Sequence, residues 1–134
     1  MSHIVGVPTG FKPTGYVDFA NVLYRATEIL EFASRLALKG ALGRSAVIEV
    51  GMSGIRDRVL LSLEARRAWR SFCPASVDSL AHPAIGLHAA DLVAQRREVA
   101  VELAIWFYER FRWDGWDRTM LREMQRKFVE NVWD

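Results

Sequence analysis

The feature that most constrains this chain is the stretch of residues 88–112, which is apolar around most of a helical circumference. At 100° per residue, one broad arc and the side opposite it both carry large apolar side chains. The apolar positions are Leu92, Val93, Val99, Ala100, Val101, Leu103, Ile105, Phe107, Tyr108 and Phe111. The polar positions form a narrow stripe of Asp91, Gln95, Glu98, Glu102 and Glu109. Such a helix must be buried on several sides, so we expect either the central helix of a domain or part of an oligomer interface.

The length and composition indicate one soluble globular domain. A chain of 134 residues can bury roughly two-thirds of its surface, enough for a core without disulfides or metals. Hydrophobic residues make up 51% and charged residues 25%, which excludes wholesale disorder and fibrous repeats. The single cysteine, Cys73, excludes an internal disulfide framework and a cysteine-based zinc cluster.

Two further helices are expected on either side of the long one. Residues 16–39 repeat apolar side chains at three- and four-residue steps, and Gly40 is well placed to end that helix in the left-handed conformation. Asp114 or Asp117 is expected to cap a last helix, whose one apolar face comes from residues 120–132. Residues 1–15 are predicted to be an extended lead-in or linker, because they are rich in glycine and proline.

A β-hairpin is predicted between the first two helices. In residues 45–64 the β-branched residues cluster, the period drops toward two, and Ser53-Gly54 suits a tight reversal. Residues 73–87, with two prolines and a glycine, are expected to be mostly loop. We therefore predict an α+β fold in which three main helices pack on a small antiparallel sheet or β-hairpin, as a single domain over residues 16–134.

Charge and targeting signals favour a cytoplasmic protein without a membrane partner. The first residues lack the pattern of a signal peptide, and no uninterrupted apolar run is long enough to span a membrane. The net charge of +2 is a weak argument for nucleic acid, but its distribution is uneven. Residues 54–72 carry five basic and two acidic groups, whereas residues 73–109 carry two basic and five acidic groups.

The main hypothesis is a non-enzymatic module for protein interaction or oligomerisation. The excess of apolar helical surface and the five tryptophans favour a homo-oligomer or a larger protein partner. The residues expected at the interface are Trp106, Phe107, Trp113 and Trp116. No cofactor is expected, because the sequence has neither a phosphate-binding loop nor a dinucleotide fingerprint. Gly51–Ile55 also lacks the spacing of a serine-nucleophile elbow.

Two alternatives remain open from the sequence. Arginine forks match phosphates, so an arginine-rich hairpin surface interleaved with Trp69 would suit nucleic acid. Its members are Arg56, Arg58, Arg66, Arg67 and Arg70. The second alternative is a small metal-dependent enzyme that uses His82, His88 and Asp91, which lie within ten residues but match no strong metal signature.

Two segments of the chain resemble a known family. The segment GYVDFANVLYRATEILEFASRLAL, followed by SAVIEVGMSGIRDRVLLS, resembles the C-terminal region of bacterial Schlafen-like proteins, which are described as ATP-binding or DNA-binding. The resemblance covers roughly residues 14–110 and includes no diagnostic catalytic motif. It implies that the chemistry belongs to an N-terminal domain, so no catalytic residue is carried over. This chain would then be an accessory or self-association part.

Overall fold

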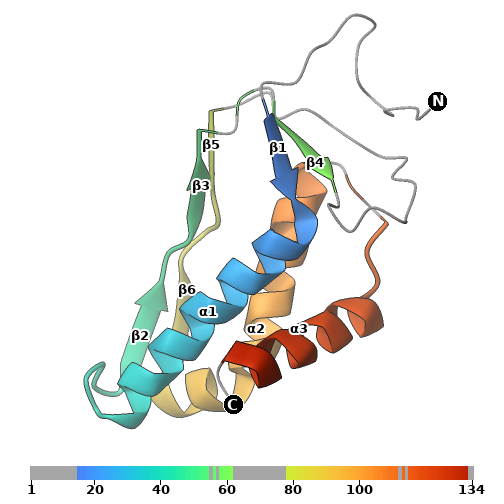
Figure 1. The fold of residues 1–134 in the computed structure, drawn as a ribbon. Helices are drawn as coiled ribbons and strands as arrows, with labels where there is room; N and C mark the ends of the chain where they lie inside the picture. The colour runs from blue at the N-terminus through green and yellow to red at the C-terminus, as the bar shows by residue number, and fades with distance from the viewer. Residues whose placement is uncertain are drawn as a thin grey trace, which may run out of the picture.

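The computed structural model describes residues 15–54, 56, 58–61, 78–111, 113 and 115–132. Three helices and six short strands follow one another along the chain (Figure 1). The helices are α1 (Phe19–Leu38), α2 (Ala89–Arg110) and α3 (Arg118–Val132). The strands are β1 (Gly15–Asp18), β2 (Ser45–Ile48), β3 (Gly51–Ser53), β4 (Arg58–Leu61), β5 (Ser79–Ala81) and β6 (Ile85–His88). Residues 1–14 of the predicted lead-in lie outside the described residues, and its last residue, Gly15, begins β1.

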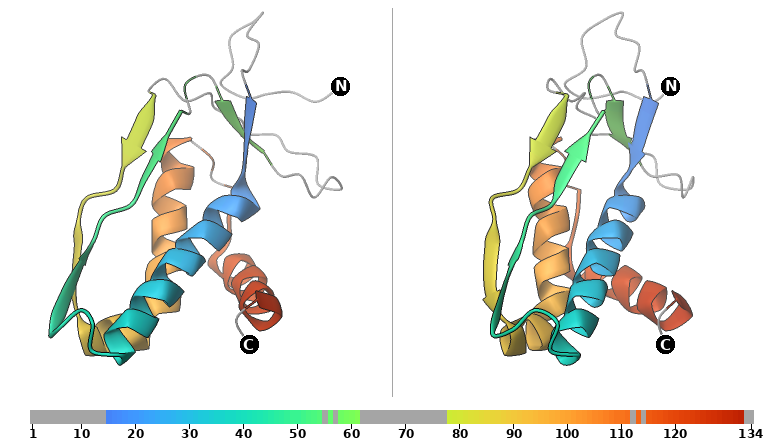
Figure 2. Two further views of the ribbon diagram at one scale, coloured as in Figure 1. Left: turned by 60° about the vertical axis from the view of Figure 1, so that its left-hand side comes forward. Right: turned by 90° about the vertical axis from the view of Figure 1, so that its left-hand side faces the viewer.

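Helices α1 and α2 run antiparallel and form the centre of the fold (Figure 1). The strands β2, β3, β5 and β6 form a long two-stranded ribbon on one side of this pair, and α3 crosses on the other side (Figure 2). The α+β class, with three helices on a small antiparallel sheet, is therefore confirmed.

The strand partners differ from the predicted hairpin. Residues 45–53 do not turn back at Ser53-Gly54 to pair with the strand that follows. Their antiparallel partner is the segment 79–88, which was expected to be mostly loop. The prediction relied on Ser53-Gly54 as a hairpin turn. Gly54 does have the positive φ of such a turn, +67°, but the strand that follows it does not pair with β3. That strand is β4, which pairs in parallel with β1.

The ribbon contains a one-residue bulge. Ile48 pairs with Ile85 and Gly51 pairs with Ala81, so two residues on one strand face three on the other. The extra residue lies within 82–84, where Pro83 has no N–H to give to a ladder. The bulge places the His82 ring edge-on against Trp106 of α2, with 4.9 Å between ring centroids.

Local capping signals explain the ends of the helices. Asp18 accepts a hydrogen bond from the Ala20 N–H at 3.3 Å and so caps α1, which begins at Phe19 and not at the predicted residue 16. Gly40, at φ +75°, ends α1 as predicted: its own N–H reaches the Ala37 carbonyl, and the N–H of Ala41 reaches Leu36. Of the two aspartates predicted to cap the last helix, Asp117 accepts a hydrogen bond from the Thr119 N–H, and Asp114 lies outside the described residues.

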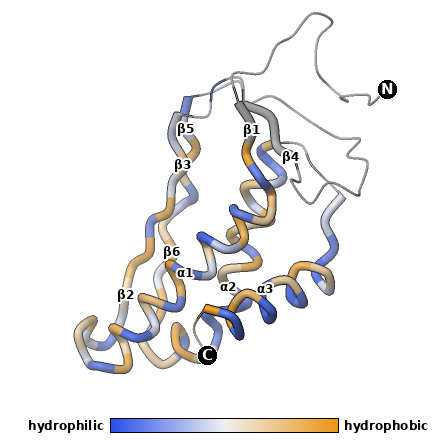
Figure 3. Tube along the Cα trace, viewed as in Figure 1, coloured by the Kyte–Doolittle hydropathy of each residue, from blue (hydrophilic) through white to orange (hydrophobic). Residues whose placement is uncertain are grey.

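The apolar perimeter of α2 is covered by its own chain. From Ala100 to Tyr108 every residue is buried except Glu102, which is exposed, and Trp106, which is half-buried. Residues of the ribbon, α1 and α3 pack around this half, and Figure 3 shows that apolar positions occur along all of these elements. The helix is thus the central one of the domain, the first of the two expectations. In the described part of the chain no helix is long and apolar enough to cross a bilayer.

Buried polar groups fasten α3 to the helix pair. Gln125, which is 3% exposed, donates its amide N–H to the Thr27 hydroxyl of α1 at 3.1 Å and to the Arg97 carbonyl of α2 at 2.9 Å. The Tyr24 ring of α1 stacks on Phe128 of α3 with centroids 4.4 Å apart. These contacts join all three helices, so α3 has a fixed place in the fold.

Candidate functional site

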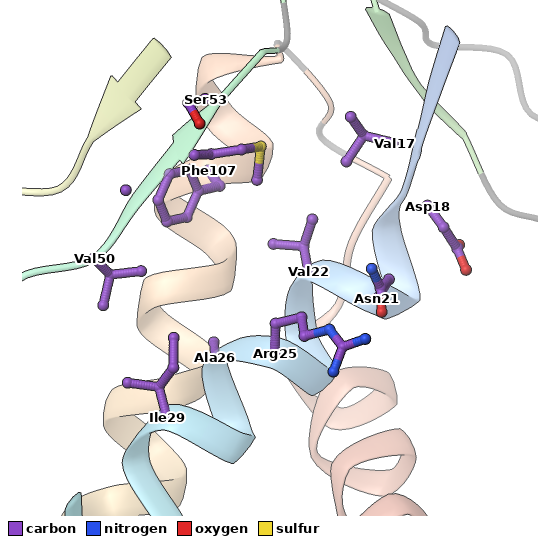
Figure 4. A pocket seen from close by; sticks show the side chains of 12 residues that line it. Val17, Asp18, Asn21, Val22, Arg25, Ala26, Ile29, Val50, Ser53 and Phe107 are labelled. Carbon is purple, nitrogen blue, oxygen red and sulfur yellow. The ribbon is translucent and has the colours of Figure 1, made fainter.

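A groove of about 320 Å³ opens between α1 and the ribbon (Figure 4). Its floor is apolar and comes from three elements: Val22 and Ala26 of α1, Val50 and Met52 beside and within β3, and Phe107 of α2. The Phe107 ring is 3% exposed and points into the space between α1 and β3 (Figure 4). The groove is at the small end of the range for ligand pockets, enough for one or two apolar side chains.

One wall of the groove is the free edge of the ribbon. Among the residues that the structure describes, β3 pairs with β5 alone, and its other edge, here called the free edge, faces α1 (Figure 2). The His82 N–H donates to the Val50 carbonyl at 2.9 Å, which makes these two a hydrogen-bonded pair of the ladder. Backbone direction alternates along a strand, so Gly51 and Ser53 point their N–H and C=O groups away from β5. Both residues are exposed and line the groove.

The opposite wall is polar at its rim. Asn21 and Arg25 of α1 stand there with Asp18, the capping residue. The Arg25 guanidinium also pairs with Glu28, with Nη1 2.9 Å from Oε1, and its side chain is 67% exposed. An isolated exposed pair of this kind contributes little to stability, so Arg25 can turn toward a new partner at small cost.

Exposed apolar side chains continue the groove onto the surface. Ile29 of α1 lines the groove and is 39% exposed, and Phe32 is 60% exposed. Val47 of β2 is 69% exposed but alternates with the buried Ile48, so it lies on the outer face of the ribbon, away from the groove. Phe32 lies three residues after Ile29, which places it on the neighbouring side of α1. Leu38, also exposed, lies nine residues after Ile29, which is half a turn round the helix axis and away from the groove.

The aromatic residues predicted for an interface occupy different environments. Trp113 is 2% exposed and packs against Phe19 and Tyr108, with ring centroids 4.9 and 4.8 Å away. Trp106 and Trp116 are half-buried, with the guanidinium of Arg110 4.1 Å above the Trp106 ring. Phe107 alone of the four lines the groove. Burial leaves Trp113 no surface to offer a partner in this conformation.

The acidic stripe of α2 faces arginines of α3. Arg122 forms a two-pronged pair with Glu98 at 2.9 and 3.0 Å, and Arg118 does the same with Glu102 at 2.9 and 3.2 Å. The hydrogen bond from Arg118 holds the pKa of the Glu102 carboxyl below its ordinary value. These two carboxylates are thus engaged in ion pairs within the chain.

The arginine-rich surface falls mostly outside the described residues. Arg66, Arg67 and Arg70, together with Trp69 and Cys73, lie in the segment 62–77, of which nothing is described. Arg56 is described and exposed, and Arg58 begins β4. The nucleic-acid alternative therefore stays a prediction.

The three residues of the metal alternative do not gather into one site. His82 sits at the bulge against Trp106, whereas His88 and Asp91 are exposed at the start of α2. Among the residues described, no three histidine, cysteine, aspartate or glutamate side chains gather closely enough to hold a metal ion. His82, His88 and Asp91 do not meet.

Comparisons with models of known protein families, with curated proteins and with solved structures give no match. The geometry must therefore carry the functional argument. The sequence predicted Phe107 as an interface residue but did not predict the groove. One wall of the groove is the free edge of the ribbon, and the sequence does not indicate which strands pair. The only local signal was the apolar alternation through Ile48, Val50 and Met52, which marks one strand face and not its partner.

Proposed function

We propose that this domain is a non-enzymatic protein-interaction module whose contact surface is the groove and the exposed apolar residues beside it. The observation that carries the proposal is the continuity of Phe107, Ile29 and Phe32 from the groove floor to the surface of α1. Exposed apolar side chains next to an apolar recess are the usual mark of a polypeptide contact.

The location of this surface changes the reason for expecting a partner. The helix α2 was the original reason, but its apolar residues are covered by α1, α3 and the ribbon. The exposed apolar surface beside the groove lies on α1 instead, at Ile29 and Phe32. The resemblance to the C-terminal region of Schlafen-like proteins implies a setting for this proposal, in which this chain is itself an accessory part that self-associates or docks on a larger protein.

Three matched variants test the proposal: Ile29→Glu, Phe32→Glu and the control Leu38→Glu. All three place a carboxylate at an exposed position of the same helix, but Leu38 lies on the side away from the groove. The measurement is affinity capture from the native host with the wild type and each variant as bait, compared by quantitative mass spectrometry. We expect a specific protein to be retained by the wild type and by Leu38→Glu, and lost from the other two baits.

Sedimentation velocity at tens of micromolar completes the test by reporting self-association. Concentration-dependent dimers that Phe32→Glu abolishes would support the same surface, with a second copy as the partner. A monomeric wild type that captures the same proteins as both groove variants would contradict the proposal.

A further inference from the structure

We propose that the groove binds an extended peptide segment of another protein, which adds a strand to the free edge of β3 and places an apolar side chain over Phe107. This inference rests on the proposed function and specifies the occupant. Three observations support it: the backbone of β3, the floor of the groove and the position of α1.

The backbone of β3 offers the hydrogen-bonding groups that an added strand needs. Gly51 and Ser53 turn their N–H and C=O groups away from β5 and toward α1, two residues apart. An unpaired edge of this kind is a template for strand addition, in which main-chain hydrogen bonds supply the affinity.

The floor supplies the side-chain recognition. A strand added beside β3 directs every second side chain toward the face that Val50 and Met52 also point to. On that face the strand would meet Phe107, Val22 and Ala26, all apolar. We therefore expect a bound sequence with aliphatic residues at alternate positions, two of them filling the groove.

The position of α1 decides against a second copy. Edge-to-edge pairing of two ribbons needs both free edges open to a folded neighbour, but here α1 flanks the edge (Figure 2). A recess between a strand and a helix admits a single extended chain more readily than another folded domain. The rim carries one charge of each sign, from Asp18 and Arg25, so it favours neither a strongly acidic nor a strongly basic segment.

The chain offers a matched pair of variants for the test, Ser53→Pro and Ser79→Pro. These two serines lie directly opposite each other in the ribbon, and both are exposed. Neither N–H points into the β3–β5 ladder, so proline removes an outward donor in each case, but only Ser53 faces the groove. Circular dichroism melting curves establish that both variants fold.

The probe is a phage-displayed library of random dodecapeptides, selected on the wild-type domain. We expect enriched peptides with aliphatic residues at alternate positions, which bind Ser79→Pro as well as the wild type. Loss of one main-chain hydrogen bond and the bulk of the proline ring should weaken binding to Ser53→Pro about tenfold. Hydrogen exchange provides a second readout that needs no variant: a bound peptide should protect the amides of Gly51 and Ser53 and leave Ser79 unchanged.

Each other outcome overturns the strand-addition proposal and separates it from the proposed function. Peptides that bind both proline variants equally, yet fail to bind Ile29→Glu, would support the groove as an interaction surface and contradict strand addition to β3. If no peptide is enriched above the starting library, the proposal that the groove binds a peptide is wrong. The capture experiment then tests the proposed function separately. Dimers of the wild type that Ser53→Pro dissociates would make a second copy the occupant.

Discussion

The two flanks of α2 are built in opposite ways. On the α3 flank, Gln125 joins three helices by buried hydrogen bonds, and Glu98 and Glu102 hold two arginines. On the ribbon flank, the described contacts with α2 are mainly apolar, and a groove separates β3 from α1. The first flank joins its helices by side-chain hydrogen bonds and ion pairs, whereas on the second one edge of β3 has no partner strand among the described residues. The difference indicates which surface stabilises the fold and which is left for a partner.

The largest change in the free energy of unfolding is expected from a truncation on the α3 flank, and it shows whether this flank stabilises the fold more strongly than the ribbon. Leu121 of α3 is fully buried, so Leu121→Ala should lower the free energy of unfolding by about 3 kcal/mol through lost contacts and a cavity. Leu80 of β5 is half-buried, and Leu80→Ala should cost less than half as much. Urea unfolding of both variants measures the difference. Equal losses would show that the two flanks contribute alike.

A smaller effect is expected from the buried amide at the junction of the three helices. Gln125→Leu keeps a similar shape but removes the donor to the Thr27 hydroxyl and the Arg97 carbonyl, at a cost of about 1 kcal/mol. The control is Gln95→Leu, an exposed glutamine of α2 that should change stability by no more than about 0.5 kcal/mol. If the two variants unfold at the same urea concentration, the junction is not what fastens α3.

The ion pairs between α2 and α3 should give a still smaller, pH-dependent effect. Arg118 lowers the pKa of Glu102 in the folded state, so the pair stabilises the fold above the ordinary carboxyl value of 4.5. This contribution is lost as the pH falls through the lower folded pKa. The melting temperature of Glu102→Gln should lie slightly below that of the wild type at pH 6, and the gap should narrow steadily as the pH is lowered below 4.5. Molar salt at pH 6 should also narrow it, and a gap independent of both pH and salt would rule out the pairing as its cause.

The smallest effect on stability is expected on the open flank, at Phe32. Its side chain is 60% exposed, so Phe32→Ser should change the free energy of unfolding by no more than about 0.5 kcal/mol. Thermal melts of the variant and the wild type provide the measurement. A large destabilisation would mean that Phe32 belongs to the core and would remove it from the proposed contact surface.

The strands show where sequence reasoning failed. The cluster of β-branched residues at 45–50 correctly predicted a strand, but the partner was wrong because Ser53-Gly54 resembles a hairpin turn. The true partner, 79–88, contains Pro83, whose ring argues against a strand unless a bulge accommodates it, as here. The candidate site followed the same course: Phe107 was named, but Gly51 and Ser53 were missed because only the pairing reveals which edge is free.

By itself, the sequence determined the features that depend on neighbours within a few residues. The three helices, the left-handed Gly40 and the Asp117 cap follow from periodicity and from hydrogen bonds that span two to five positions. Only the tertiary structure decided which elements cover α2, where Gln125 finds its partners 98 and 28 residues away, and which edge of β3 remains open. Those contacts join distant segments, and their choice depends on the total burial and hydrogen bonding of the whole chain, which no local pattern encodes.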